Sequence, residues 1–291
     1  MNTSNASHIK LIECPRDAMQ GWKRPIPTEK KIEYINALLK VGFDTIDFGS
    51  FVSPKAVPQM ADTKEVISKL DLGLAETKTK LLAIVANQKG AEDAVVYDEI
   101  SYLGFPFSIS ETFQQRNTNS TIKESLHRVE EIQNLCIKNH KELVIYISMG
   151  FGNPYGDAYD ESIVGYWVDK IAGIGIETIS IADTVGLATP EQVFSILNGL
   201  IPKYPSIEIG AHLHSTPIHW KEKINAAVKA GCTRFDGALK GIGGCPFAND
   251  ELVGNMNTEL MIPYFEELKL LQGINVDALQ YCSRLAASIF V

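Results

Sequence analysis

The chain has 291 residues, enough for one large hydrophobic core or two of medium size. Its net charge of -8 argues against a nucleic acid or an anionic membrane surface bound through bulk charge. No apolar run approaches the roughly 20 residues of a membrane helix, and the first ten residues lack a signal-peptide core. We therefore expect a cytoplasmic protein with no membrane and no nucleic-acid partner.

The sequence alternates short β-rich runs with longer helical patterns. The predicted strands are Ile9–Glu13, Thr45–Phe48, Leu81–Ala86, Ile100–Leu103, Val144–Ser148, Thr178–Ile181, Glu208–Ala211 and Arg234–Gly237. The predicted helices between them are Thr28–Val41, Ser120–Asn139, Asp160–Ile174, Pro190–Leu200 and Thr216–Ala230. Eight such units predict an α/β fold, a (β/α)8 TIM barrel, forming a single domain over residues 1–291.

The open doubly wound sheet is the alternative fold for this pattern. That sheet usually carries G-x-G-x-x-G after its first strand, whereas here the first strand leads into Cys14-Pro15-Arg16-Asp17. After the eighth strand, Met256–Leu271 and Asp277–Ile289 both have a helical pattern. We interpret them as the last barrel helix and a C-terminal helical extension.

The most informative stretch is the seventh strand, which leads into His212-Leu213-His214. Alternation along a strand predicts that the two imidazoles share one face, where they could chelate a metal ion. Functional residues of such barrels lie at the carboxyl ends of the strands, and Asp17 follows the first strand. One Asp and two His favour Mg²⁺ or Mn²⁺, with Zn²⁺ less favoured.

Other polar residues follow strand ends, and each has a plain structural interpretation beside the functional one. Arg16 could form a surface ion pair or stabilise an oxyanion. Asp47 and Asp183 could cap turns or helices, or act on a substrate. Asn255 could be a turn residue or a neutral metal ligand. Cys245 could be structural, or could transfer protons from a mobile loop that contains Gly241, Gly243 and Gly244.

Five motifs together resemble the 3-hydroxy-3-methylglutaryl-CoA lyases. These enzymes belong to the metal-dependent, pyruvate-carboxylase-like TIM-barrel family of lyases, aldolases and Claisen-condensing synthases. The motifs are Pro15-Arg16-Asp17, the run Ser50-Phe51-Val52-Ser53-Pro54-Lys55 with Val57-Pro58-Gln59-Met60, Asp183-Thr184-x-Gly186, His212-x-His214, and Gly241-x-Gly243-Gly244-Cys245-Pro246. The resemblance covers nearly the whole chain.

The resemblance implies a retro-Claisen cleavage of 3-hydroxy-3-methylglutaryl-CoA to acetyl-CoA and acetoacetate. It implies a divalent cation held by Asp17, His212, His214 and Asn255. Catalytic roles are implied for Arg16, Asp47, Asp183, His212 and Cys245. Contacts with the acyl-CoA substrate are implied for Arg16, Gln20, Ser50 and Lys55. A homodimer is the default expectation for the assembly.

Several positions depart from the family pattern. Asp47 stands where the family has a glutamate, Ala18 replaces a glycine, and Ser215 replaces an aspartate after the second histidine. The interval from Cys245 to Asn255 is one residue longer than usual. These departures keep two alternatives open: an aldolase or Claisen-condensing acyltransferase acting on another acid, and a non-catalytic acyl-CoA-binding paralogue.

Overall fold

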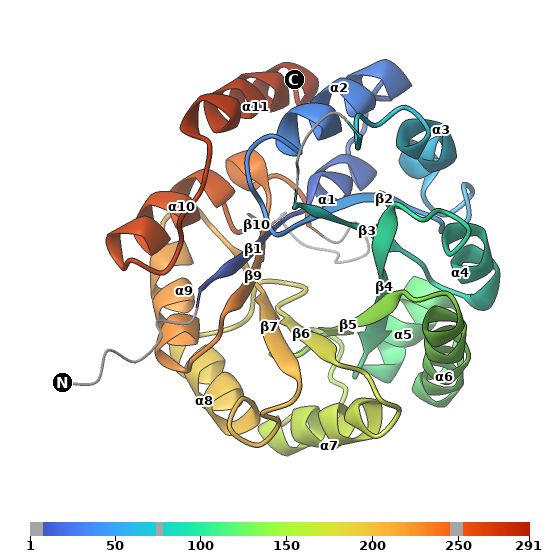
Figure 1. The fold of residues 1–291 in the computed structure, drawn as a ribbon. Helices are drawn as coiled ribbons and strands as arrows, with labels where there is room; N and C mark the ends of the chain where they lie inside the picture. The colour runs from blue at the N-terminus through green and yellow to red at the C-terminus, as the bar shows by residue number, and fades with distance from the viewer. Residues whose placement is uncertain (1–7, 74–77, 245–252) are drawn as a thin grey trace.

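The computed structural model describes residues 8–73, 78–244 and 253–291. Within these ranges, eight parallel strands close into a barrel in the order β1-β2-β3-β4-β5-β6-β7-β9 (Figure 1). The strands are β1 (Lys10–Glu13), β2 (Thr45–Ser50), β3 (Lys80–Ile84), β4 (Ile100–Ser108), β5 (Glu142–Ser148), β6 (Thr178–Ala182), β7 (Glu208–His212) and β9 (Arg234–Gly237). The predicted (β/α)8 barrel is confirmed.

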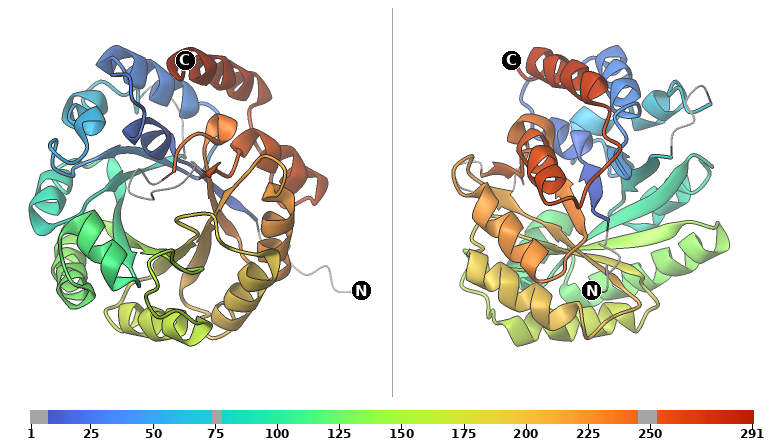
Figure 2. Two further views of the ribbon diagram at one scale, coloured as in Figure 1. Left: turned by 180° about the vertical axis from the view of Figure 1, so that it is seen from behind. Right: turned by 60° about the vertical axis from the view of Figure 1, so that its left-hand side comes forward.

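Helices surround the barrel on its outer side, as Figures 1 and 2 show. They are α1 (Pro15–Gln20), α2 (Thr28–Leu38), α3 (Thr63–Ile67), α4 (Gln88–Ala94), α5 (Glu111–Thr118), α6 (Ile122–Lys138), α7 (Glu161–Ala172), α8 (Pro190–Leu200), α9 (Trp220–Lys229), α10 (Thr258–Glu267) and α11 (Val276–Ile289), with short 3-10 turns at Pro58–Met60 and Leu239–Gly241. None of these helices is long and apolar enough to cross a membrane.

The C-terminal extension is present as α11, which packs against α2 on the outside of the barrel (Figure 1). The ring of Phe290 lies edge-on to Trp22, with ring centroids 5.3 Å apart, and to Tyr34 at 6.4 Å. These aromatic contacts bury apolar surface from both ends of the sequence. The extension therefore stabilises the N-terminal part of the barrel wall.

Alternation of side chains along the strands produces two separate apolar regions. Leu82, Ile84, Tyr102, Val144 and Tyr146 form a small buried cluster inside the barrel. A much larger cluster, which includes the neighbouring residues of the same strands, fills the space between the barrel wall and the helices.

Some short elements were not predicted. The six residues of α1 are too few to show a helical period, and Gly104 and Pro106 weaken the strand signal in β4, which continues past the predicted end at Leu103. Strand β7 ends at His212, and His214 lies in a separate two-residue strand, β8 (His214–Ser215). The partner of β8 is the antiparallel β10 (Gly254–Asn255), outside the barrel sheet.

A buried carboxyl group joins the first barrel strand to the segments that follow the last barrel strand. Glu13 ends β1, with no exposed surface. Its Oε1 accepts a hydrogen bond from the Leu239 backbone N–H at 2.8 Å, and its Oε2 accepts one from the Thr258 hydroxyl at 2.6 Å. Burial outweighs these hydrogen bonds and raises the pKa of Glu13 from 4.5 to about 8.

We predict that Glu13→Gln changes how stability depends on pH. The folded chain retains the Glu13 proton that the unfolded chain releases above pH 4.5, so the contribution of this group is complete below 4.5 and is lost as pH rises through about 8. Glutamine keeps an oxygen for Leu239 and removes this titration. In urea unfolding, the free energy of unfolding of the variant relative to that of the wild type should increase between pH 5 and pH 8 by on the order of a few kcal/mol. A constant difference would contradict the raised pKa.

Candidate active site and metal centre

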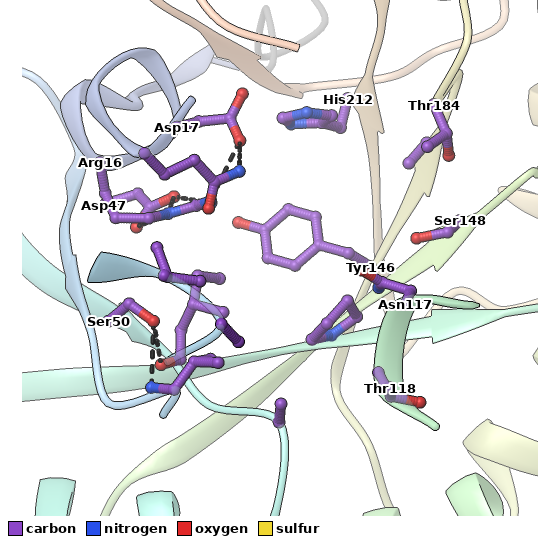
Figure 3. Close-up of a pocket in the computed structure, with 18 of the residues that line it drawn as sticks. Arg16, Asp17, Asp47, Ser50, Asn117, Thr118, Tyr146, Ser148, Thr184 and His212 are labelled. Atoms are coloured by element: carbon purple, nitrogen blue, oxygen red, sulfur yellow. Dashed lines mark hydrogen bonds and ion pairs between the residues drawn. The ribbon is translucent and has the colours of Figure 1, made fainter. Parts of the chain in front are cut away.

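A cavity of about 180 Å³ opens at the carboxyl ends of the barrel strands (Figure 3). The described residues that line it come from β2 to β7 and from the segments that follow the strands. They are Arg16, Asp17, Gln20, Asp47, Ser50, Val52, Ala56, Val57, Ile84, Ala86, Pro106, Phe113, Asn117, Thr118, Tyr146, Ser148, Ala182, Thr184, His212 and His214. Charged groups gather at one side, and apolar side chains form much of the remaining wall.

Arg16 is the centre of the charged side of this cavity. Its position in α1, directly after β1, directs the guanidinium between two carboxylates (Figure 3). Nε donates to both carboxylate oxygens of Asp47, at 3.1 and 3.0 Å, and one terminal nitrogen donates to Asp17 Oδ1 at 3.0 Å. The pairing of β2 with β3 shifts register between Asp47 and Gly49. The Asp47 side chain lines the cavity beside this irregularity.

The two carboxylates have different electrostatic environments. Burial acts to raise the pKa of Asp17, but Arg16, both histidines and the amide of Asn255 outweigh it and lower that pKa. Burial dominates at Asp47, where it raises the pKa to about 6 despite the ion pair with Arg16. Asp17 is therefore ionised, while Asp47 is a carboxylate that can exchange a proton near neutral pH.

His212 is fixed by a buried carboxylate. Its Nδ1 lies 3.0 Å from Oδ2 of Asp236. Asp236 is the third residue of β9 and is 2% exposed. Burial lowers the pKa of His212, but Asp236 outweighs this effect and raises it. With the proton on Nδ1, the ring presents the lone pair of Nε2 for coordination.

Asp17, His212 and His214 each offer a ligand atom within 4.8 Å of the others. Neither ring nitrogen of His214 makes a hydrogen bond of normal geometry with a described residue, although the ring is 3% exposed and the Thr184 backbone is near. Asn255 donates to Asp17 Oδ2 at 2.7 Å, and its own buried Oδ1 lacks a partner within the described ranges. These buried nitrogen and oxygen atoms, which lack hydrogen-bond partners among the described residues, fit the coordination of a divalent cation.

A second trio, Cys14, His212 and Asp236, is equally compact. Its members suit a metal less well. Burial, reinforced by the nearby carboxylates, raises the pKa of the Cys14 thiol well above its ordinary value, so the sulfur stays protonated. One oxygen of the Asp236 carboxylate, Oδ2, is already engaged by His212. The trio of Asp17, His212 and His214, with Asn255 beside it, is therefore the better candidate for a metal site.

The HMGL-like family model matches residues 9–286. The chain belongs to the HMGL-like family. A hydroxymethylglutaryl-CoA lyase of Bacillus subtilis is 32% identical over 265 residues, which cover 91% of this chain and 87% of the relative. The human cytoplasmic 3-hydroxy-3-methylglutaryl-CoA lyase is 32% identical over 92% of this chain and 71% of the relative.

Solved structures agree with this membership. An HMG-CoA lyase from Acinetobacter baumannii, in complex with coenzyme A and 3-methylmalate, has a TM-score of 0.90 and 32% identity. The alignment covers 99% of this HMGL-like chain and 93% of that one. The Bacillus subtilis HMG-CoA lyase has a TM-score of 0.89 and 30% identity, covering 97% and 94% of the two chains. The predicted resemblance is confirmed.

The remaining predicted residues of this HMGL-like chain occupy different places. Gln20 lines the cavity and donates to Asp17 Oδ1 at 2.9 Å, and Ser50 lines it beside Ile84. Lys55 is exposed and is not among the described residues that line the cavity. Cys245 lies outside the described residues.

Both carboxylate oxygens of Asp183 are bound by other groups of the protein. Its Oδ2 accepts from the Lys223 ammonium at 2.8 Å, and its Oδ1 accepts from the Ala188 backbone at 3.1 Å. Among the described residues, Thr184 rather than Asp183 lines the cavity at the end of β6. The carboxylate therefore joins the loop after β6 to α9.

Sequence reasoning missed Asp236, Lys223 and Tyr146. Asp236 lies in the predicted eighth strand and on the same face as Arg234, so strand alternation could have found it. Lys223 lies within an amphipathic helix, where a lysine is ordinarily solvated. Tyr146, whose ring lies 5.7 Å from that of His212, is indistinguishable in the sequence from a core aromatic residue.

We predict that Gly243→Ala weakens metal binding. Gly243 has φ +115°, and a Cβ there would overlap the Asn255 amide and lie 3.0 Å from Asp17 Oδ2. Both displaced groups belong to the candidate metal site, so Mn²⁺ affinity in isothermal titration should fall by roughly 10- to 100-fold.

Gly165→Ala is the matched control for this substitution. Gly165 lies within α7, and a Cβ there would meet nothing within 4 Å. The control should bind Mn²⁺ as the wild type does. Wild-type affinity in Gly243→Ala would show that the loop does not constrain Asp17 and Asn255.

Proposed function

We propose that this chain is a divalent-metal-dependent lyase that cleaves 3-hydroxy-3-methylglutaryl-CoA to acetyl-CoA and acetoacetate. Family membership supports the activity, because relatives that match over most of the chain are named for it. The observation that carries the proposal is the cluster of Arg16, Asp17, His212, His214 and Asn255 at one side of the cavity. This cluster combines a cation site with a guanidinium beside it.

Asp17, His212, His214 and Asn255 are the residues that we propose to hold the cation, with Mg²⁺ or Mn²⁺ favoured by the mixed oxygen and nitrogen donors. When bound, such a cation supplies Lewis-acid chemistry that lowers the pKa of a substrate hydroxyl. Gln20 and Asn255 each donate to Asp17 and so fix the orientation of its carboxylate.

Asp47 is the best-placed base for the tertiary hydroxyl of the acyl group. It lines the cavity and has a pKa of about 6, whereas Asp183 is not among the described residues that line the cavity and His212 is a proposed metal ligand. As Asp47 takes the hydroxyl proton, the hydroxyl carbon becomes the ketone of acetoacetate. The carbon–carbon bond breaks, and its electron pair passes to the thioester as an enolate.

Arg16 is placed to stabilise the enolate oxygen. Its guanidinium remains charged beside two carboxylates and borders the cavity, so a developing negative charge meets a fixed positive one. Protonation of the enolate carbon then gives acetyl-CoA. We assign that proton to Cys245, which follows the described Gly243-Gly244 segment.

The coenzyme A portion has a neighbouring hollow available. This second hollow, of about 280 Å³, shares Ser50 and Val52 with the acyl cavity and is lined by Lys64 and Lys89. Both ammonium groups bind Asp93, which leaves one net positive charge there. We propose that the thioester arm passes over Ser50 towards these lysines.

Assay of metal-stripped protein tests the function directly. We expect 3-hydroxy-3-methylglutaryl-CoA to yield equal amounts of acetyl-CoA and acetoacetate only after Mg²⁺ or Mn²⁺ is added. Asp17→Asn should abolish both metal binding and product formation, because it removes the ionised ligand. The test uses chromatography of the CoA esters and an enzymatic assay of acetoacetate.

The alternatives give distinct results in the same assay. Condensation of acetyl-CoA with a 2-keto acid would identify a synthase. Binding of the acyl-CoA without turnover under any divalent metal would identify a non-catalytic paralogue. Metal-independent cleavage would contradict the assigned role of the Asp17–His212–His214 cluster.

We predict that Asp47 sets the acidic limb of the pH profile. A base acts in its ionised form, so kcat should fall as pH decreases through about 6, where Asp47 gains a proton. Asp47→Asn should lower kcat by about 10²- to 10⁴-fold and remove that limb.

Asp47→Glu is the control, because it retains a carboxylate and should retain an acidic limb. Initial rates from pH 5 to 8 at saturating substrate and metal measure both effects. An unchanged limb in Asp47→Asn would assign the titration to another group.

A further inference from the structure

The two metal-binding histidines are held in different ways. His212 ends β7, pairs in register with Ala182 of β6, and has Nδ1 fixed by Asp236. His214 lies beyond the barrel sheet, in the two-residue β8. Among the described residues no acceptor makes a normal hydrogen bond to its ring. The position of His214 therefore depends on what holds its main chain.

The main chain of His214 pairs with Asn255 of β10 and is also held by a buried lysine. Lys223, in the first turn of α9, is 6% exposed. Its ammonium donates to the His214 carbonyl at 2.8 Å, to Asp183 Oδ2 at 2.8 Å and to the Gly186 carbonyl at 3.2 Å. One side chain thereby joins the loop after β6 to the strand that carries a metal ligand.

The three contacts match the chemistry of an ammonium group. Lysine has three N–H donors and no acceptor, and here three oxygens from two chain segments, the loop after β6 and β8, receive them. Asp183 balances the charge, which makes burial of the ammonium tolerable. A neutral amide could neither supply three donors from one atom nor balance Asp183.

We propose that Lys223 is a positioning residue that fixes His214 for metal binding. The proposal rests on the metal site assigned under the proposed function. Lys223 lies outside the set of residues that line the cavity within the described ranges, so it acts through His214 and not on the substrate. In this view Asp183 keeps the ammonium in place, and the Asp183–Lys223 pair supports the cation site from behind.

A second buried lysine provides a matched control. Lys31 is 4% exposed, and its ammonium donates to Asp62 at 2.7 Å and to the Gln59 carbonyl. It therefore has the same chemistry, a carboxylate and a main-chain oxygen, but it contacts no residue assigned to the metal site. Loss of Lys31 reports what the loss of a buried ion pair does by itself.

The test measures Mn²⁺ affinity of the metal-stripped full chain by electron paramagnetic resonance, together with thermal unfolding. We expect Lys223→Met to weaken Mn²⁺ binding at least 10-fold, while Lys31→Met lowers the melting temperature but keeps wild-type affinity. In nitrogen-15 spectra of the imidazoles without metal, Lys223→Met should shift His214 more than His212.

The double variant Lys223→Met/Asp183→Asn separates positioning from charge balance. It leaves no carboxylate stranded, so it should regain thermal stability and still bind Mn²⁺ weakly. Wild-type Mn²⁺ affinity in the double variant would overturn the proposal, because Lys223 would then serve only to neutralise Asp183. If Lys223→Met does not fold, the double variant decides alone. Absence of Mn²⁺ binding in the wild type would instead overturn the metal site itself.

Discussion

A carboxylate that must stay ionised while buried is the constraint on which the site depends. Asp17 is 7% exposed, and an isolated charge at that depth would take up a proton. Five side chains prevent this, namely Arg16, Gln20, His212, His214 and Asn255, which come from both ends of the sequence. Barrel closure is what brings these groups together, so the chemistry of Asp17 is a property of the whole fold.

The pairing of Arg16 with Asp47 shows how one cation can serve two purposes. The Arg16 guanidinium offsets only part of the effect of burial on Asp47, so the pKa of Asp47 rises to about 6. Asp47 can therefore exchange a proton near neutral pH. The pairing also leaves a guanidinium at the wall of the cavity. Asp47, shorter than the family's glutamate, is held by both oxygens against Arg16 rather than projecting further into the cavity.

The sequence predicted the features that repeat or that stand at strand ends. Alternation found the strands, and the carboxyl-end rule found Arg16, Asp17, Asp47 and His212. It did not predict that His214 leaves the strand, because a two-residue pairing with β10, forty residues later, has no local period. Nor did it predict Lys223, because its partner Asp183 lies forty positions away and an ordinary helical lysine has the same local pattern.

The seam between β1 and β9 has a consequence for how the protein acquires its metal. These strands pair from Lys10↔Arg234 to Glu13↔Gly237, so the barrel closes only when segments more than two hundred residues apart meet. Asp17 precedes this closure in the sequence and Asn255 follows it. A chain emerging from the ribosome therefore carries the two candidate ligands separately until the segment that contains Asn255 has been made. Completion of the candidate metal site thus requires the least local strand pairing of the barrel, a kind of contact that generally forms slowly.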